Sequence, residues 1–314
     1  MEATVKVILF LEPVFKEMIW GGERLRTDFG YEIPSNHTGE CWAVSAHANG
    51  DCTIKKGRYK GNSLSSLWDN HRYLFGNLDG DVFPLLIKII DAKEDLSIQV
   101  HPDDTYAKEN ENGSLGKTEC WYILDCNTDG QIAIGHNAKS KTELKAMINN
   151  HSWKELIRLL PIKEGDFFQI EPGTVHAIKA GTLILETQQN SDITYRLYDY
   201  DRLFNGKARE LHIDKCIDVI SCPHKDIKSK KDITTYEQGI EEKLISCSYY
   251  TVSKVMVIGK QTFLQNEPFT ILSVIDGEGQ IDGTPIAKGD HFILPAGYGQ
   301  YTLSGNMSLI KSNV

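Results

Sequence analysis

Short hydrophobic segments separated by turn residues make up most of the chain. They have the length and the β-branched or aromatic content of strands and lie between Gly, Pro, Asn and Asp. The clearest of them are residues 85–90, 96–100, 119–124, 166–170 and 182–188. Such a density of short strands is typical of a sandwich or barrel rather than of a parallel sheet. We therefore expect a mainly β protein.

Helical signals are few. Ser140 and Ser152 each precede a glutamate by three residues, which is the spacing of a capping box, and they predict helices over about 140–150 and 152–160. Further helices are expected over 64–75 and 208–220. The first two would form a small helical insertion near residues 139–160 in the β fold.

One pattern occurs twice. Residues 165–176 read GDFFQIEPGTVH, and residues 289–300 read GDHFILPAGYGQ. Each copy runs from a Gly-Asp turn through a strand to a glycine-containing corner, as in cupins, so the repetition predicts two stacked cupin-like jelly-roll barrels. We assign residues 1–235 to a catalytic domain and 236–314 to a C-terminal domain, with the charged segment near 223–243 as the boundary.

The first copy of the pattern ends in a residue that can bind a metal. It closes on His176, whereas the second closes on Gln300, so only the first barrel is expected to bind a metal and the second to be metal-free. The remaining histidines are expected to be structural or on the surface. They are His37, His47, His71, His136, His151, His212, His224 and His291.

The segment around Gln99 supplies partners for His176. Residues two apart on a strand point to the same face, so Gln99 and His101 would project together while Ile98 and Val100 face the other way. Glu119 follows at the start of the next strand. Two imidazoles, a carboxylate and an amide oxygen form a suitable ligand set for Zn²⁺, so we predict one zinc ion per chain.

At these residues the chain resembles type I mannose-6-phosphate isomerases in their shorter bacterial form. The resemblance spans residues 20–200, and its segments are 20–22, 39–42, 84–88, 97–104, 116–119, 173–181 and 191–196. It implies reversible interconversion of mannose 6-phosphate and fructose 6-phosphate. It also implies that Gln99, His101, Glu119 and His176 are the zinc ligands and that Arg196 is an essential active-site residue.

Aldose–ketose interconversion moves a proton between two carbons through an enediol, so it needs a base and stabilisation of negative charge. Lys88 lies in an otherwise apolar strand and is expected to point into a polar cavity, with ring opening or acid–base transfer as its role. Glu186 and Asp192 could each orient Arg196 or accept a proton. The sequence does not decide which of the three groups carries the proton.

Two further residues are candidates for binding the substrate. Lys117 lies two residues before Glu119, on the same strand face, and could contact sugar oxygens or the phosphate. Trp20 is a candidate for the wall of the sugar pocket, although burial in the N-terminal sheet is an equal alternative.

Composition excludes several partners. The net charge of −9 disfavours nucleic acid, and no apolar run approaches the ~20 residues that a membrane span needs. Seven cysteines without a C-x-x-C pair indicate neither a disulfide framework nor a cysteine zinc site. We expect a cytoplasmic monomer or homodimer whose partner is a small sugar phosphate.

Two other functions compete with the isomerase. Two histidines and a carboxylate also suit a non-haem Fe(II) oxygenase, but Gln99 and the cations Lys88, Lys117 and Arg196 argue against it. The second alternative is a sugar-binding module that kept the metal and lost turnover. The presence of both Lys88 and Arg196 beside intact ligands disfavours that alternative.

Overall fold

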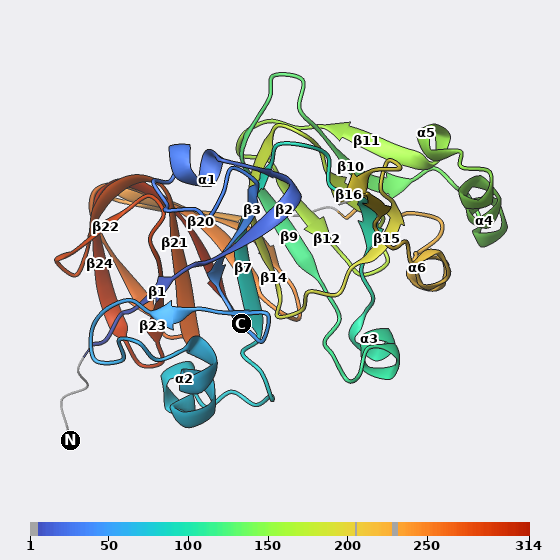
Figure 1. The fold of residues 1–314 in the computed structure, drawn as a ribbon. Helices are drawn as coiled ribbons and strands as arrows, with labels where there is room; N and C mark the ends of the chain where they lie inside the picture. Colours follow the sequence, from blue (N-terminus) through green and yellow to red (C-terminus); the bar gives the residue numbers. More distant parts are fainter. Residues whose placement is uncertain (1–5, 205, 228–231) are drawn as a thin grey trace.

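Antiparallel strands dominate the protein, so the prediction of a mainly β fold is confirmed (Figure 1). The fold is described here from a computed structural model, which covers residues 6–204, 206–227 and 232–314. The described helices are short, and none is long and apolar enough to cross a membrane.

The first β unit consists of two sheets that enclose a common core. The larger sheet has the order β12 (Phe167–Ile170), β9 (Glu119–Cys126), β14 (Thr182–Gln189), β7 (Leu85–Ala92), β2 (Val14–Gly22) and β3 (Thr38–Val44). The smaller has the order β11 (Ile157–Pro161), β10 (Gln131–His136), β13 (His176–Ile178), β8 (Ile98–Val100) and β15 (Tyr195–Tyr198). Apolar side chains such as Ile184 from the larger sheet and Ile132 from the smaller meet between them. All five strands predicted from the sequence are present.

Helices cover the outer face of the smaller sheet. Side chains of α4 (Lys141–Asn149), α5 (Trp153–Leu156) and α6 (Ile213–Val219) share a core with those of β8. Ser140 caps α4, because its side chain accepts a hydrogen bond from the Glu143 amide. Ser152 makes no such bond, and the prediction of a helix over 152–160 is wrong after Leu156. The following residues instead pair with β10 as strand β11.

Two other predicted helices are shorter than expected. The segment 64–75 divides into α2 (Leu64–Asn70) and the 3-10 helix η1 (Arg72–Phe75). The predicted helix 208–220 begins only at Ile213, because β17 (Lys207–Ala208) pairs with β16 (Leu203–Phe204). The helices α1 (Arg24–Thr27) and α3 (Asp104–Asn110) were not predicted, although Asp103 caps α3 with its side chain.

The second β unit is one open sheet that folds over its own core (Figure 1, orange and red). Its order is β18 (Asp232–Tyr236), β19 (Gly239–Ser246), β20 (Thr251–Gln265), β24 (Gly299–Asn313), β21 (Phe269–Ile281), β23 (His291–Pro295), β1 (Leu9–Glu12) and β6 (Thr53–Ile54), with β22 (Thr284–Ala287) beside β21. A separate small pair is formed by β4 (Ala46–His47) and β5 (Gly50–Asp51). Strand β1 pairs with β23, so the C-terminal sheet contains a strand from the start of the chain. The expected boundary segment includes residues 228–231, which lie outside the described residues.

The repeated sequence pattern forms the same local structure in both units. Gly165 and Gly289 both have a positive φ, of 85° and 92°, a conformation that glycine adopts without strain. The aspartate after each glycine accepts a hydrogen bond from a backbone amide three residues earlier, at 2.9 Å in both copies. The repeat therefore marks two equivalent turns, each leading into a strand.

The two β units share a hydrophobic core. Ile87 and Leu185 of the larger sheet pack in one cluster with Val252 and Ile271 of the C-terminal sheet. Because side chains alternate along a strand, the residues next to Ile87 and Leu185 face the opposite side. That side is turned toward the smaller sheet, and the predicted site residues lie there.

Candidate active site

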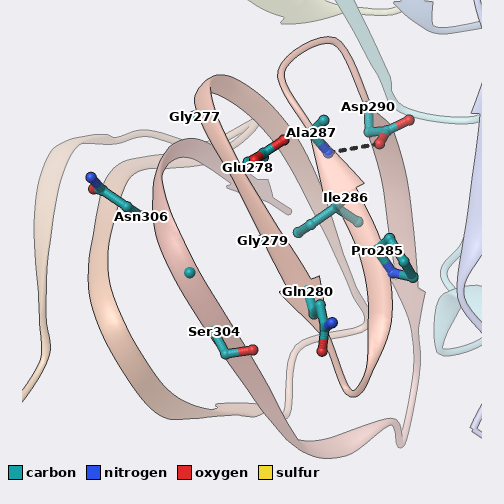
Figure 2. A pocket seen from close by; sticks show the side chains of 11 residues that line it. Gly277, Glu278, Gly279, Gln280, Pro285, Ile286, Ala287, Asp290, Ser304 and Asn306 are labelled. Carbon is teal, nitrogen blue, oxygen red and sulfur yellow. Dashed lines mark hydrogen bonds between the residues drawn. The ribbon is translucent and has the colours of Figure 1, made fainter.

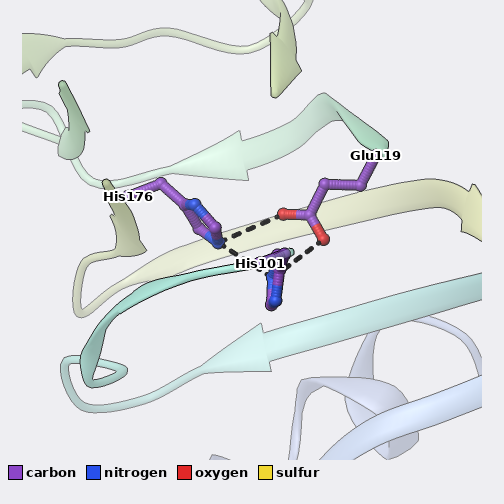
Figure 3. A group of neighbouring side chains, drawn as sticks. All are labelled: His101, Glu119 and His176. Carbon is purple, nitrogen blue, oxygen red and sulfur yellow. Dashed lines mark hydrogen bonds and ion pairs between the residues drawn. The ribbon is translucent and has the colours of Figure 1, made fainter. Parts of the chain in front are cut away.

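Three predicted metal ligands converge between the two sheets (Figure 3). His176 begins β13, His101 follows β8 directly, and Glu119 begins β9. The Nε2 atoms of the two histidines lie 3.1 Å apart, and each lies 3.4 Å from one oxygen of Glu119. All three side chains are buried. The sheets thus bring together residues that are far apart in the sequence.

Hydrogen bonds fix the tautomer of both histidines. His101 Nδ1 lies 2.7 Å from the Ile193 carbonyl, and His176 Nδ1 lies 2.8 Å from the Thr174 carbonyl. A carbonyl only accepts, so each Nδ1 carries the hydrogen and each Nε2 presents a lone pair. Burial, together with the charge of Lys117, lowers the pKa of His101 to about 3. Two neutral imidazoles therefore direct lone pairs at one point, which is what a bound cation requires.

Glu119 provides the negative charge of the group. Burial alone would raise the pKa of Glu119, but Lys117 and the two histidines outweigh this effect and hold the pKa well below its usual range. Lys117 Nζ lies 2.9 Å from Glu119 Oε2. Within the described part of the chain neither carboxylate oxygen has a well-oriented hydrogen-bond donor. A buried anion with unsatisfied oxygens beside two imidazole lone pairs fits a divalent metal.

Gln99 lies next to this group. Its side-chain amide nitrogen is placed 3.2 Å from His176 Nε2. The oxygen and nitrogen of a side-chain amide are assigned from the hydrogen-bond network. With the amide of Gln99 turned over, its oxygen and the lone pair of His176 Nε2 could face the same cation. Ile98 and Val100 are buried on the other face with the helices, as the alternation along the strand predicted.

A cavity of about 290 Å³ opens beside the histidines and Glu119. Of the predicted catalytic and substrate residues, all line it: Trp20, Lys88, Lys117, Glu186, Asp192 and Arg196. Gln99 also lines it, whereas Ile90, Leu96 and Ile178 supply apolar wall. The cavity is large enough for a small sugar phosphate. Its many charged side chains suit a polar, charged ligand.

Strand register places three cavity side chains and the neighbouring Trp121 in one row across the larger sheet. Lys88 is directly opposite Trp42 of β3 on one side and Glu186 of β14 on the other, and Glu186 is opposite Trp121. Lys88 Nζ lies 3.7 Å from Glu186 and 3.5 Å from Glu40, whose carboxylate also accepts a hydrogen bond from the Trp42 indole. Lys88 is therefore held between two carboxylates.

Glu186 differs from the other acidic groups of the cavity. Trp121 donates a hydrogen bond of 3.0 Å to its Oε1, while its Oε2 is buried without a well-oriented donor among the described residues. Burial, reinforced by the charge of Glu119, raises the pKa of Glu186 to about 7. A carboxyl group with such a pKa can both accept and release a proton near neutral pH.

Arg196 of β15 and Asp192, which precedes this strand, also line the cavity. Asp192 is at the rim, where Asn49 donates to it at 2.5 Å and His47 Nε2 lies 3.4 Å away. Arg196 is directly opposite Gln99 in the smaller sheet. Among the described residues, no hydrogen bond or ion pair joins Arg196 to Glu186 or Asp192. Neither carboxylate therefore orients the arginine here.

Three titratable residues that line the cavity were not predicted as site residues. Glu40 lies within the Gly39–Trp42 motif, but the sequence gave no sign that it would contact Lys88. Arg209 carries no motif at all. His212 was expected to be structural or on the surface, yet it lines the cavity with Arg209. Sequence distance hid all three, since Glu40 lies on β3 and the other two lie in the segment before α6, both far in sequence from most of the predicted site residues.

A larger hollow of about 880 Å³ lies on the C-terminal unit between β21, β22 and β24 (Figure 2). Glycines and backbone form much of its wall, and the charged side chains lining it are Glu278 and Asp290. An anionic ligand would be repelled there. We therefore assign the chemistry to the smaller cavity, where cations and the candidate metal ligands meet.

The histidine of the second repeat has ordinary partners. His291 Nδ1 lies 2.8 Å from the Ser273 hydroxyl, and its Nε2 lies 2.9 Å from the Tyr31 hydroxyl. Both ring nitrogens are thus hydrogen-bonded inside the core, as expected of a structural histidine. Gln300, at the corner position of this repeat, is exposed.

Known proteins resemble the chain over its whole length. The family model for the catalytic domain of phosphomannose isomerase type I matches residues 8–154, and that for the cupin domain of mannose-6-phosphate isomerase matches residues 240–314. Mannose-6-phosphate isomerase ManA of Bacillus subtilis is 53% identical over 311 residues, with 98% of each chain covered.

A second relative, the mannose-6-phosphate isomerase of Streptococcus mutans, is 46% identical over 97% of this chain and 98% of its own. The crystal structure of the mannose 6-phosphate isomerase from Bacillus subtilis has a TM-score of 0.96 at 51% identity, covering 98% of this chain and 99% of that one. A protein of Archaeoglobus fulgidus, described as a putative mannosephosphate isomerase, shares the fold at a TM-score of 0.76 and 20% identity, with 99% of each chain covered. The chain therefore belongs to the type I phosphomannose isomerase family, as its motifs predicted.

Proposed function

We propose that this chain is a zinc-dependent aldose–ketose isomerase that interconverts D-mannose 6-phosphate and D-fructose 6-phosphate through an enediol. The observation that carries the proposal is the buried group of His101, Glu119 and His176 beside a cavity lined with cations. Full-length relatives named mannose-6-phosphate isomerases support the choice of substrate.

The donor set supports zinc in particular. Two neutral imidazoles and one carboxylate, with the Gln99 amide beside them, are nitrogen and oxygen ligands of the kind that hold Zn²⁺ while leaving room for substrate. When bound, zinc would act as a Lewis acid that stabilises negative charge on a substrate oxygen, an effect worth several kcal/mol.

Glu186 and Lys88 are the groups best placed to handle the proton. Glu186, with a pKa raised to about 7 by burial and by Glu119, can take a proton from one substrate carbon and return it to the next. Lys88, 3.7 Å away, balances the charge of the carboxylate and can donate to the ring oxygen during ring opening. We therefore assign proton transfer to Glu186 in preference to Asp192, which is tied to Asn49 and His47 at the rim.

The cavity also restricts water and holds the substrate. Trp20 forms part of its wall and is 4% exposed, so it can pack against a sugar face while shielding the reacting carbons. Arg196, which stays protonated, can bind an oxygen that becomes negative in the transition state.

An assay of mannose 6-phosphate conversion in heavy water tests this proposal. We expect fructose 6-phosphate to form and solvent deuterium to enter the product at the carbon that receives the proton, because an enediol exchanges its proton through the base. Absence of conversion would contradict the isomerase assignment. Conversion in which the hydrogen is transferred directly, with no deuterium in substrate or product at any extent of reaction, would contradict the enediol route.

A further inference from the structure

The turn that joins β19 to β20 carries the C-terminal unit onto the first β unit. A hydrogen bond of 2.9 Å from the Cys247 amide to the Tyr250 carbonyl closes this turn. Tyr250 is fully buried in the core that the two units share, and its hydroxyl donates to the Gln169 side chain of β12 at 3.2 Å. The turn is therefore fixed against the first unit, and with it the neighbouring residue Tyr249.

Tyr249 contacts a carboxylate of the first unit. Its hydroxyl donates a hydrogen bond of 2.8 Å to Oδ2 of Asp104, the first residue of α3. Oδ1 of the same carboxylate accepts from the backbone amide of Gly116 at 2.8 Å and from the side-chain amide of Gln189 at 3.0 Å. Hydrogen bonds to a charged acceptor are the stronger kind. Asp104 thus joins the C-terminal unit firmly to two other segments.

One of these segments leads into β9. Residues 114–118 belong to no helix or strand, although the last three of them are buried. Their amides therefore need acceptors other than a neighbouring strand. Asp104 accepts from the first of the three amides, and it holds the Gln189 side chain, whose oxygen accepts from the Thr118 amide at 2.8 Å. Two of the three buried amides thus depend on one carboxylate.

The position of this segment determines the position of two site residues. A Cβ on Gly116 would lie 2.4 Å from the carbonyl carbon of Asp103 and 2.4 Å from the amide nitrogen of Asp104, so the segment lies directly against the start of α3. Lys117 follows at once and lines the cavity, and Glu119 is a candidate zinc ligand. Lys117 Nζ and Glu119 Oε2 are only 2.9 Å apart. A shift of the segment would move both side chains.

We propose that Tyr249 is a positioning residue of the site, which acts through Asp104 on the segment that carries Lys117 and Glu119. The inference rests on the proposed zinc-dependent isomerase function. Neither Tyr249 nor Asp104 lines the cavity, and none of the described residues of the C-terminal unit does so. The C-terminal unit would therefore contribute to the reaction by holding residues of the first unit in place. Partners that orient a metal ligand typically contribute about ten- to a hundredfold to metal affinity or activity.

The test is Tyr249→Phe, which removes only the hydroxyl, with Tyr298→Phe as the matched control. The Tyr298 hydroxyl donates to Asp282 at 2.9 Å within the C-terminal unit, so each variant loses one hydrogen bond from a tyrosine to an aspartate. Tyr249→Phe should weaken zinc binding about tenfold, measured by competition with a chelator, and should lower kcat about tenfold at saturating zinc. Tyr298→Phe should leave both quantities within about twofold of the unaltered protein.

A double-mutant cycle tests the route through Asp104. Asp104→Asn keeps the size of the side chain and removes its charge, so we expect it to weaken zinc binding at least as much as Tyr249→Phe does. Adding Tyr249→Phe to Asp104→Asn should then weaken binding by less than about threefold more, because the two residues act as one unit. The melting temperature of the metal-free protein should fall by similar amounts in the two tyrosine variants, which separates positioning from stability.

Three results would overturn the inference. Unchanged zinc affinity and unchanged kcat in Tyr249→Phe would show that the contact has no effect on the site. Equal losses in Tyr249→Phe and Tyr298→Phe would show a general effect of stability. Independent, multiplicative losses in the double variant would show that the hydroxyl does not act through Asp104. Absence of isomerase activity in the unaltered protein would contradict the proposed function alone, and the zinc affinities would then decide the inference.

Discussion

At the scale of single residues, the two buried glutamates of the site have opposite surroundings. The pKa of Glu119 is held well below its usual range against the effect of burial by Lys117 and the two histidines, whereas burial and Glu119 raise the pKa of Glu186 to about 7. Pairs of titratable groups whose pKa values are driven apart commonly divide acid–base and electrostatic roles. Glu119 is thus suited to hold a cation, and Glu186 to carry a proton.

The pH dependence of activity tests the role of Glu186. Only its ionised form accepts a proton, and this form is lost as the pH falls through about 7. We expect kcat/KM to fall about tenfold per pH unit below that value. The neutral variant Glu186→Gln should lose about a hundredfold or more in kcat and should lack this acidic limb.

Metal content measured at each pH is the control for that experiment. The pKa of His101 is lowered to about 3 by burial and Lys117, so this ligand stays unprotonated across the range. Retention of the acidic limb in Glu186→Gln would assign the proton transfer to another group.

A second residue-scale prediction separates binding of the metal from catalysis. Glu119→Gln removes the charge of a ligand, so we expect zinc affinity to fall by more than the ten- to hundredfold typical of changes around a metal site. Arg196→Ala should lower kcat about a hundred- to a thousandfold and retain one zinc per chain. Elemental analysis of both purified variants provides the measurement. Loss of zinc from Arg196→Ala would make that residue structural.

The sequence predicts a site residue where a local spacing rule identifies it, and not where its role depends on a contact between distant segments. Gln99 and His101 could be found because two-residue spacing on a strand is a local rule, and their placement follows it. The partnership of Glu40 with Lys88 and the exposure of Arg209 to the cavity depend on which strands become neighbours. No local pattern encodes such contacts, so they became visible only in the structure.

At the scale of elements, the corner before His176 controls the geometry of the site. The Gly173 amide donates to the His101 carbonyl, and the Ser221 amide donates to the Gly173 carbonyl, both at 2.9 Å. Gly173 has a φ of 81°, and a Cβ on it would lie 2.5 Å from the Ser221 hydroxyl and 2.7 Å from the Val219 carbonyl. Only glycine fits this corner.

Substitution of the corner glycines tests this statement. Gly297, in the second repeat, also has a positive φ, but a Cβ there would meet no atom within 4 Å. We expect Gly297→Ala to cost about 1 kcal/mol from backbone strain alone. Gly173→Ala should cost about 3 kcal/mol and weaken zinc binding as well. Denaturant unfolding with metal titration checks both. Equal effects in the two variants would refute a special role for this corner.

Strands with a clear apolar run were predicted correctly, whereas a helix predicted from a capping motif alone was only partly correct. The strands 85–90 and 182–188 were found because each contains a short apolar run, and in the structure every residue of β7 and β14 is buried. The helix predicted after Ser152 ended early, because pairing of Ile157–Pro161 with β10 satisfies those backbone groups. Tertiary pairing overrode a capping motif whose side-chain bond does not form.

At the scale of the whole molecule, both β units depend on one core. Phe269 of the C-terminal sheet is fully buried, and its ring centroid lies 5.8 Å from that of Phe75 and 5.1 Å from that of Phe83. We expect Phe269→Ala to destabilise the protein by about 3–5 kcal/mol. Unfolding followed by tryptophan fluorescence and by zinc release should still give coincident transitions.

The exposed residue Ile258 in the same sheet is the control, because Ile258→Ala should change stability by less than about 0.5 kcal/mol. Two separated transitions in Phe269→Ala would show that the units fold independently. The repeat in the sequence predicted two units, but it gave no indication that β1 would pair with β23. The pattern of hydrophobic residues in either segment does not indicate which distant strand it will pair with.

Titration of metal-free protein with zinc tests the central claim most directly. The protein would first be stripped with a chelator, and conversion of mannose 6-phosphate would then be followed as zinc is added. The buried group of His101, Glu119 and His176 predicts no turnover before addition and a linear rise that stops at one zinc per chain. Full activity of the stripped protein, or a rise unrelated to zinc occupancy, would contradict the account.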